Sequence, residues 1–128
     1  MSYNKYKQTA VESASQEKLL LMLYEGAIKF TKRAILAVES NDIPARCENI
    51  TKSYDIILEL MNTLDFNVGG EVAENLEQLY MFMTEELTRA NITGKADHLQ
   101  NVLKILETLY EGWKEAVEII KKKEIKGA

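Results

Sequence analysis

The 128-residue chain has little of what usually builds a catalytic or metal-binding site. It contains one histidine, one cysteine, one proline and six glycines. The single cysteine, Cys47, excludes a disulfide within the chain and is usual for a reducing compartment. Cys47 and His98 together are too few to hold a structural zinc ion. Stability must therefore come from a buried apolar core, which a chain of this length can form.

Patterns typical of cofactor binding are also missing. A di-iron bundle needs Glu-x-x-His pairs, but Lys95 stands three residues before His98. Gly69 and Gly70 lack the spacing of a phosphate-binding loop. We interpret Cys47 as a small apolar residue and His98 as a surface residue, which leaves a nucleophile pair without support. We expect no catalytic residue, no metal and no cofactor.

The charges and apolar runs exclude two further classes of protein. The net charge is −4 and both signs are scattered, which argues against nucleic-acid binding. Apolar runs are too short to span a membrane, and the N-terminus lacks a signal region. We expect a cytoplasmic protein without membrane insertion. We interpret the acidic side chains of the helices as solvated, namely Glu74, Glu77, Glu85, Glu86 and Glu107.

Apolar residues at helical spacing fill most of the chain. Breaks near residues 40–44, 65–70 and 91–95 divide it into four helical segments. Ser15 is predicted to cap the first helix, and Asn41 or Asp42 the second, with Pro44 in its first turn. Short connections favour antiparallel neighbours. The sequence therefore predicts an all-α, antiparallel up-down-up-down four-helix bundle.

The predicted organisation has three parts. Residues 1–14 form an N-terminal arm that packs on the bundle, residues 15–124 form the bundle, and residues 125–128 form a C-terminal tail. The arm shows no convincing helical periodicity. Gly26, inside the first helix, is expected where another backbone or a bulky ring packs closely, because glycine otherwise weakens a helix.

The chain carries more apolar surface than one buried helix face requires. Residues 19–24 are six consecutive apolar or aromatic residues, which would point all around a helix. Aromatic side chains also lie off the main apolar stripes: Tyr24, Tyr54, Tyr80, Tyr110 and Trp113. They either cover the edges of the core or line a groove that accepts a partner helix.

Several segments resemble the flagellar secretion chaperone FliS family. The similarity is strongest in the segments YKQTAVESAS (6–15) and EKLLLMLYEGAI (17–28). It continues at residues 56–60, 69–76, 79–83, 90–92 and 113–116. Two positions depart from the family pattern. Gln16 replaces a frequent proline, and Glu85 and Glu86 stand where many relatives have arginines, so no contact of those arginines is carried over.

The resemblance implies a cytoplasmic export chaperone without a catalytic step. Such a protein binds the C-terminal segment of flagellin, prevents its premature polymerisation and assists delivery to the flagellar type III secretion apparatus. Other flagellar regulators and export-gate components are further implied partners. The resemblance carries Tyr6 and Gln8 over as partner-binding residues, and Tyr3 is added although the arm varies in length.

The helix faces suggest where the client would bind. The predicted groove residues are Ile50, Tyr54 and Ile57 on the second helix and Leu103, Leu106 and Tyr110 on the fourth. We hypothesise that the arm, through Tyr3, Tyr6 and Val11, covers this groove until the client displaces it. Two alternatives stay open, which are a bundle that self-associates through the same surface and an enzyme or cofactor bundle.

Overall fold

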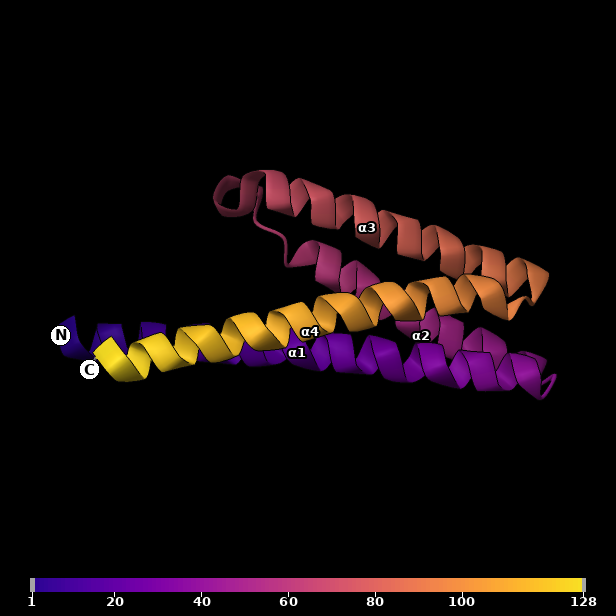
Figure 1. The fold of residues 1–128 in the computed structure, drawn as a ribbon, viewed down its shortest axis with the longest axis horizontal. Helices are drawn as coiled ribbons and strands as arrows, with labels where there is room; N and C mark the ends of the chain where they lie inside the picture. The colour runs from indigo at the N-terminus through magenta and orange to yellow at the C-terminus, as the bar shows by residue number, and fades with distance from the viewer. Residues whose placement is uncertain (1, 128) are drawn as a thin grey trace.

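The computed structural model describes residues 2–127, and the side chains of residues 15–123. Four helices follow one another: α1 (Ser2–Glu39), α2 (Ile43–Asn62), α3 (Phe66–Thr93) and α4 (Ala96–Gly127). Successive helices run in opposite directions (Figure 1). The predicted all-α, up-down-up-down four-helix bundle is confirmed.

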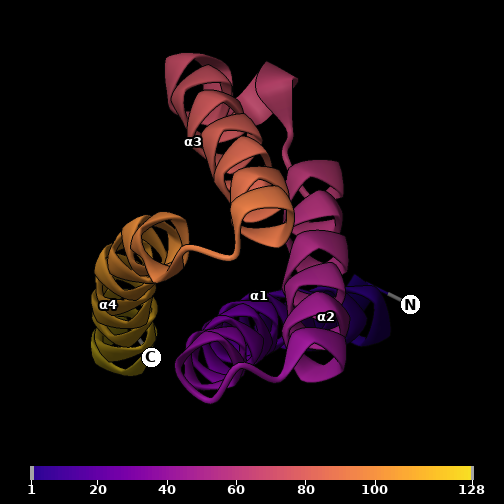
Figure 2. The ribbon, with the colours of Figure 1, turned by 90° about the vertical axis from the view of Figure 1, so that its right-hand side faces the viewer.

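The helices occupy the corners of a four-sided bundle (Figure 2). α1 packs against α2 and α4, and α3 packs against the same two helices from the other side. α2 and α4 lie diagonally opposite, and no pair of their Cα atoms comes within 8 Å. A groove bounded by α2 and α4 alone therefore does not exist in this fold.

The core lies where apolar stripes of all four helices meet. Its fully buried members include Tyr24, Ala27, Ile57, Leu60, Tyr80, Met83, Leu87, Leu99, Val102 and Leu106. Two polar side chains between α1 and α2 satisfy each other, because the Thr31 and Ser53 hydroxyls lie 2.9 Å apart. Gly26 permits close packing of α2, since a Cβ there would lie 3.1 Å from Ile56 Cδ1. The neighbour is thus an aliphatic side chain.

Short polar connections start and end the helices. Asp42 caps α2 as predicted, because its carboxylate accepts from the Ala45 N–H at 3.1 Å. Asp65 caps α3 by accepting from the Asn67 and Val68 N–H groups. Gly94 ends α3 with a φ of 71°, a left-handed conformation that glycine adopts readily.

The second connection differs from the prediction. The turn comprises residues 63–65, and one helical turn begins at Phe66 before Gly70 interrupts the helix. Gly70 has a φ of 50° and a ψ of −123°, so α3 is kinked there. The predicted break at residues 65–70 therefore lies earlier in the structure, because Asp65 caps α3 and the chain is already helical from Phe66.

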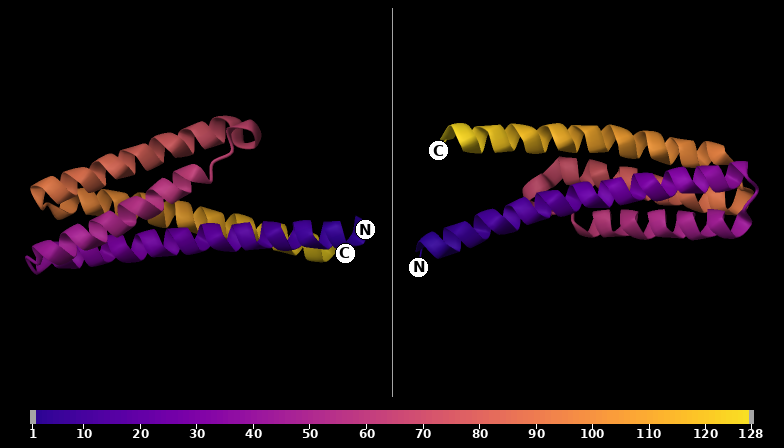
Figure 3. Two further views of the ribbon diagram at one scale, coloured as in Figure 1. Left: turned by 180° about the vertical axis from the view of Figure 1, so that it is seen from behind. Right: turned by 90° about the horizontal axis from the view of Figure 1, so that it is seen from below.

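The prediction for the N-terminal residues was also wrong in its secondary structure. α1 begins at Ser2, and Ser15 lies inside it instead of capping it. Residues 2–16 contain no glycine or proline, so no residue stops the helix that the strongly apolar segment after Ser15 establishes. The side chains of Tyr3, Tyr6 and Gln8 lie outside those described. The backbone of residues 2–14 continues α1 lengthwise (Figure 3).

The two long outer helices make one end of the bundle open. The N-terminal part of α1 and the C-terminal part of α4 extend past the α2–α3 connection in the same direction (Figures 1 and 3). At this end, α1 and α4 have fewer neighbours than at the other. Apolar side chains near the α2–α3 connection are therefore only partly covered.

Candidate partner-binding surface

A cavity of about 240 Å³ lies at the open end of the bundle. Its lining comes from α1, the α2–α3 connection, α3 and α4. The lining residues are Leu20, Thr63, Leu64, Asp65, Val68, Gly69, Val72, Ala73, Leu76, Tyr80 and Trp113. Most of these side chains are apolar, so the cavity suits an apolar side chain of a partner. We call it the end pocket.

Three aromatic side chains bring polar groups to the end pocket or close behind it. Tyr80 lines the pocket, and its hydroxyl is hydrogen-bonded to the hydroxyl of Tyr24 in the core. Burial raises the pKa of both tyrosines, and both therefore stay neutral at ordinary pH. The Trp113 Nε1–H is buried and lies near the Tyr24 hydroxyl, without a hydrogen bond of good geometry to it.

Other apolar side chains of α1 and α3 are exposed as well. On α3, Val72 of the end pocket is 61% exposed, and Phe82 is 40% exposed ten residues further along. On α1, Leu19 and Met22 are each more than half exposed. The unbroken apolar run of α1 is therefore only partly covered within the chain. Apolar surface that a chain leaves uncovered can serve as an interaction site.

The residues predicted to line a groove lie in several different environments. Ile50, Ile57 and Leu106 are buried core residues, with at most 3% of their surface exposed. Tyr54 and Leu103 are half-buried. A partner cannot reach the three core residues unless the bundle opens.

The two tyrosines of the predicted groove lie on different faces. Tyr54 and Ile50 border a cavity of about 160 Å³ between α2 and α3. Tyr110 lies between α4 and α1, where its hydroxyl donates to Glu25 Oε1. Glu25 raises the pKa of Tyr110 to about 12 through this bond. The structure does not bring the α2 and α4 groups together, and their role in binding stays a prediction.

The interpretation of Glu86 as a solvated carboxylate was wrong. Glu86 is 4% exposed and joins α3 to α4. It accepts hydrogen bonds from Arg89 Nη1 at 2.7 Å and Asn101 Nδ2 at 3.1 Å, and His98 Nδ1 lies 3.1 Å away. The bond from Asn101 is the main cause that lowers the pKa of Glu86 to about 2.

The role assigned to His98 was wrong for the same reason. His98 is half-buried against Glu86 and is not a plain surface residue. The sequence did not show this because Arg89 lies on α3, whereas His98 and Asn101 lie on α4. These side chains meet around Glu86 only when α3 and α4 pack together.

Sequence reasoning also missed the end pocket as a unit. Tyr80 and Trp113 were recognised as aromatics off the main stripes, but they were not connected to each other. The missed signal was the apolar residues on both sides of the Asp65 cap, Leu64, Phe66 and Val68. A connection between two helices that carries so many apolar residues indicates a surface that packs on something else.

Residues 15–123 contain no group of three or more histidine, cysteine, aspartate or glutamate side chains arranged to hold a metal ion. None of the helices described between residues 2 and 127 combines the length and apolar character that a membrane crossing requires.

Comparison with known proteins gives one family. Residues 1–120 match the family described as Flagellar protein FliS. A flagellar secretion chaperone FliS of Campylobacter jejuni is 37% identical over 115 residues, which cover 90% of each chain. Proteins with the same name from Salmonella typhimurium and Bacillus subtilis are 38% and 34% identical. These matches cover 84% and 91% of this chain, and 81% and 86% of the relatives. The chain therefore belongs to the FliS family, whose curated members are named as chaperones of flagellar secretion and not as enzymes.

Proposed function

We propose that this protein is a cytoplasmic export chaperone that binds the C-terminal segment of flagellin. It would prevent premature polymerisation of flagellin and assist its delivery to the flagellar type III secretion apparatus. Membership of the FliS family and the names of its curated members support the general role. The observation that carries the binding step is the end pocket with its exposed apolar surroundings.

The end pocket suits a client that folds as it binds. A segment without structure of its own loses conformational entropy when it becomes ordered, so it needs a long apolar contact for even moderate affinity. The end pocket supplies one anchor point, and the exposed faces of α1 and α3 extend the contact.

Residues 2–14 of α1 are also proposed to take part in client binding. Residues 2–14 extend from the same open end of the bundle that contains the end pocket. Tyr3, Tyr6 and Gln8 would contact the client directly or compete with it for the apolar surface. Competition of this kind would lower the apparent affinity for the client.

The proposal is tested by calorimetric titration with a peptide of about 40 residues from the C-terminus of the same organism's flagellin. We expect a one-to-one complex with a negative heat-capacity change, which reports burial of apolar surface. A folded protein that gives no heat at any temperature would contradict the proposal. A stable dimer that ignores the peptide would favour self-association through the same surface.

Two matched substitutions locate the binding site. Val72→Ser changes an exposed apolar residue of the end pocket and should weaken peptide binding about tenfold, because it removes apolar contact area. Ile43→Ser is the control, since Ile43 is 59% exposed at the beginning of α2, away from the end pocket. Both variants should unfold at nearly the same urea concentration as the unmodified protein. Equal loss of binding in both would place the client elsewhere.

A further inference from the structure

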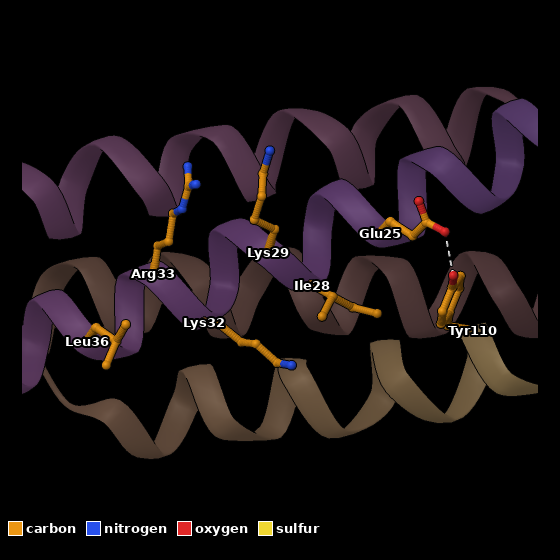
Figure 4. Close-up of a pocket in the computed structure, with 7 residues that line it drawn as sticks. All are labelled: Glu25, Ile28, Lys29, Lys32, Arg33, Leu36 and Tyr110. Atoms are coloured by element: carbon orange, nitrogen blue, oxygen red, sulfur yellow. Dashed lines mark hydrogen bonds between the residues drawn. The ribbon is translucent and has the colours of Figure 1, made fainter.

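A second concave surface lies along the middle of α1, beside α4 (Figure 4). It has a volume of about 400 Å³ and shares no lining residue with the end pocket. Its lining is Glu25, Ile28, Lys29, Lys32, Arg33 and Leu36 of α1 together with Tyr110 of α4. We call it the α1 groove. It is open along one side, so an elongated partner could lie in it.

The α1 groove combines apolar residues with cations. Ile28, Lys32 and Leu36 follow one another at four-residue intervals, so they form one stripe along α1. Leu36 is 62% exposed, which leaves most of its apolar surface without a neighbour. Lys29 and Arg33 point to the opposite edge of α1 from Lys32 (Figure 4). The stripe therefore carries Lys32 between its two apolar residues, and Lys29 and Arg33 lie along its other edge.

The cations of the α1 groove have no acidic partner in the described part of the chain. No carboxylate oxygen among residues 15–123 lies within 4.0 Å of the charged nitrogens of Lys29, Lys32 or Arg33. The one carboxylate in the lining, Glu25, accepts a hydrogen bond from Tyr110 at the end of the groove. The groove is therefore positive although the chain has a net charge of −4.

The Phe30 ring contacts two cations of the α1 groove. Lys29 Nζ lies 4.6 Å from the centroid of the Phe30 ring, and the Arg33 guanidinium carbon lies 5.7 Å from it. Lys52 of α2 approaches the same ring to 5.3 Å, but its ammonium group also pairs with Glu48 Oε1 at 3.1 Å. The face of a ring attracts cations without neutralising them. The charges of Lys29 and Arg33 therefore stay available to a partner.

We propose that the α1 groove is a docking site for an acidic amphipathic helix of a second protein. The apolar residues of that helix would pack on Ile28 and Leu36, which lie eight residues and therefore about 12 Å apart along α1. Its carboxylates would pair with Lys29, Lys32 and Arg33. A helix laid along α1 presents apolar and acidic residues at the same four-residue spacing. The proposal goes beyond client binding and does not depend on it.

The test uses two designed helical peptides of about 20 residues and amide chemical shifts of the isotope-labelled full chain. The first peptide carries leucines eight residues apart with glutamates between them on the same face, and the second has glutamine at every glutamate. We expect saturable shift changes at residues 25–36 with the first peptide only. Raising the salt from about 0.05 M to about 0.5 M should weaken binding, because exposed charge pairs are screened.

Two double variants distinguish the groove from general charge effects. Lys32→Glu with Arg33→Glu should weaken the acidic peptide at least about tenfold. Lys18→Glu with Lys121→Glu changes the net charge equally at exposed positions outside the groove, and should change binding less than about twofold. Circular dichroism checks that both variants are folded.

Several results would overturn the proposal. They are equal binding of the glutamine peptide, equal loss in both double variants, and shift changes confined to residues other than 25–36 and Tyr110. Two further results would assign the groove to another occupant. One is a dimer in solution that the Lys32→Glu, Arg33→Glu variant abolishes, and the other is saturable binding to anionic phospholipid vesicles without binding to the acidic peptide.

Discussion

At the scale of single residues, Glu86 is the one charged side chain that is buried among residues 15–123. Its carboxylate accepts from one side chain of α3 and from side chains at the beginning of α4. A buried carboxylate is tolerated only when donors surround it, and removal of its charge leaves those donors without a partner. Glu86 thus connects the α3–α4 hairpin through polar contacts that apolar packing does not supply.

Replacing Glu86 by glutamine should destabilise the protein by about 2 kcal/mol, because charge-assisted hydrogen bonds to a buried group are lost. Urea unfolding followed by circular dichroism measures this change. Glu85→Gln is the matched control, since Glu85 is exposed on the same turn of α3. Its expected effect is below about 0.5 kcal/mol. A loss of stability in Glu86→Gln as small as that in Glu85→Gln would mean that the Glu86 contacts contribute nothing to stability.

The stability that Glu86 contributes should depend on pH. The pKa of Glu86 is lowered from 4.5 to about 2 in the folded protein. Its contribution to stability is therefore complete above about pH 4.5 and is lost as the pH falls toward 2. The stability difference between the unmodified protein and Glu86→Gln should shrink over this range. A difference that stays constant from pH 6 to about pH 2.5 would contradict the assigned pKa.

At the scale of helices, α3 is kinked at one glycine, Gly70. Gly70 has a positive φ, whereas Gly112 lies in the regular part of α4. A Cβ at either position would meet no atom within 4 Å. The two glycines therefore differ in backbone conformation and not in the space around them.

Substituting alanine at these two glycines should have opposite effects. Gly70→Ala should destabilise by about 1 kcal/mol, because alanine is strained at a positive φ. Gly112→Ala should stabilise by about 0.5–1 kcal/mol, because alanine is the better helix former. Thermal and urea unfolding measure both. Stabilisation by Gly70→Ala would show that α3 runs through this position without a kink in solution.

The length of α1 gives a second prediction for the helices. Deleting residues 1–12 should leave the bundle folded, because the described core begins at Leu20 and Tyr24. Urea unfolding should stay cooperative while the helical signal falls by the length removed. If residues 2–14 compete with the client, the truncated chain should bind the flagellin peptide more tightly. Loss of cooperative unfolding would instead assign these residues to the core.

At the scale of the whole molecule, the fold could be predicted further than the site. The number, order and direction of the helices follow from apolar periodicity and from polar breaks such as Asp42 and Gly94. The beginning of α1 could not be predicted, because Ser15 favours a cap by itself but lies inside a helix when the residues on both sides are helical. Diagonal placement of α2 and α4 also escaped prediction, since Ile57 and Leu106 show the same apolar spacing whichever helix they face.

The end pocket, the contacts of Glu86 and the α1 groove each combine residues from more than one helix. Trp113 and Leu64 border one cavity although 49 positions in the sequence separate them. The donors around Glu86 come from two helices, and the cations of the α1 groove are recognisable as unpaired only when their surroundings are known. Periodicity shows which face of a helix is apolar, but it does not show which neighbour leaves that face uncovered.

The pairing of the first helix with the last also governs when the chain can fold during synthesis. α1, α2 and α3 leave the ribosome before α4, so α2 can pack on α1, and α3 can pack on α2. The face of α1 that receives α4 has no cover until the last quarter of the chain has been made. A nascent or prematurely terminated chain therefore leaves the apolar stripe of α1 exposed, and we expect limited proteolysis to cut it more readily than the complete chain.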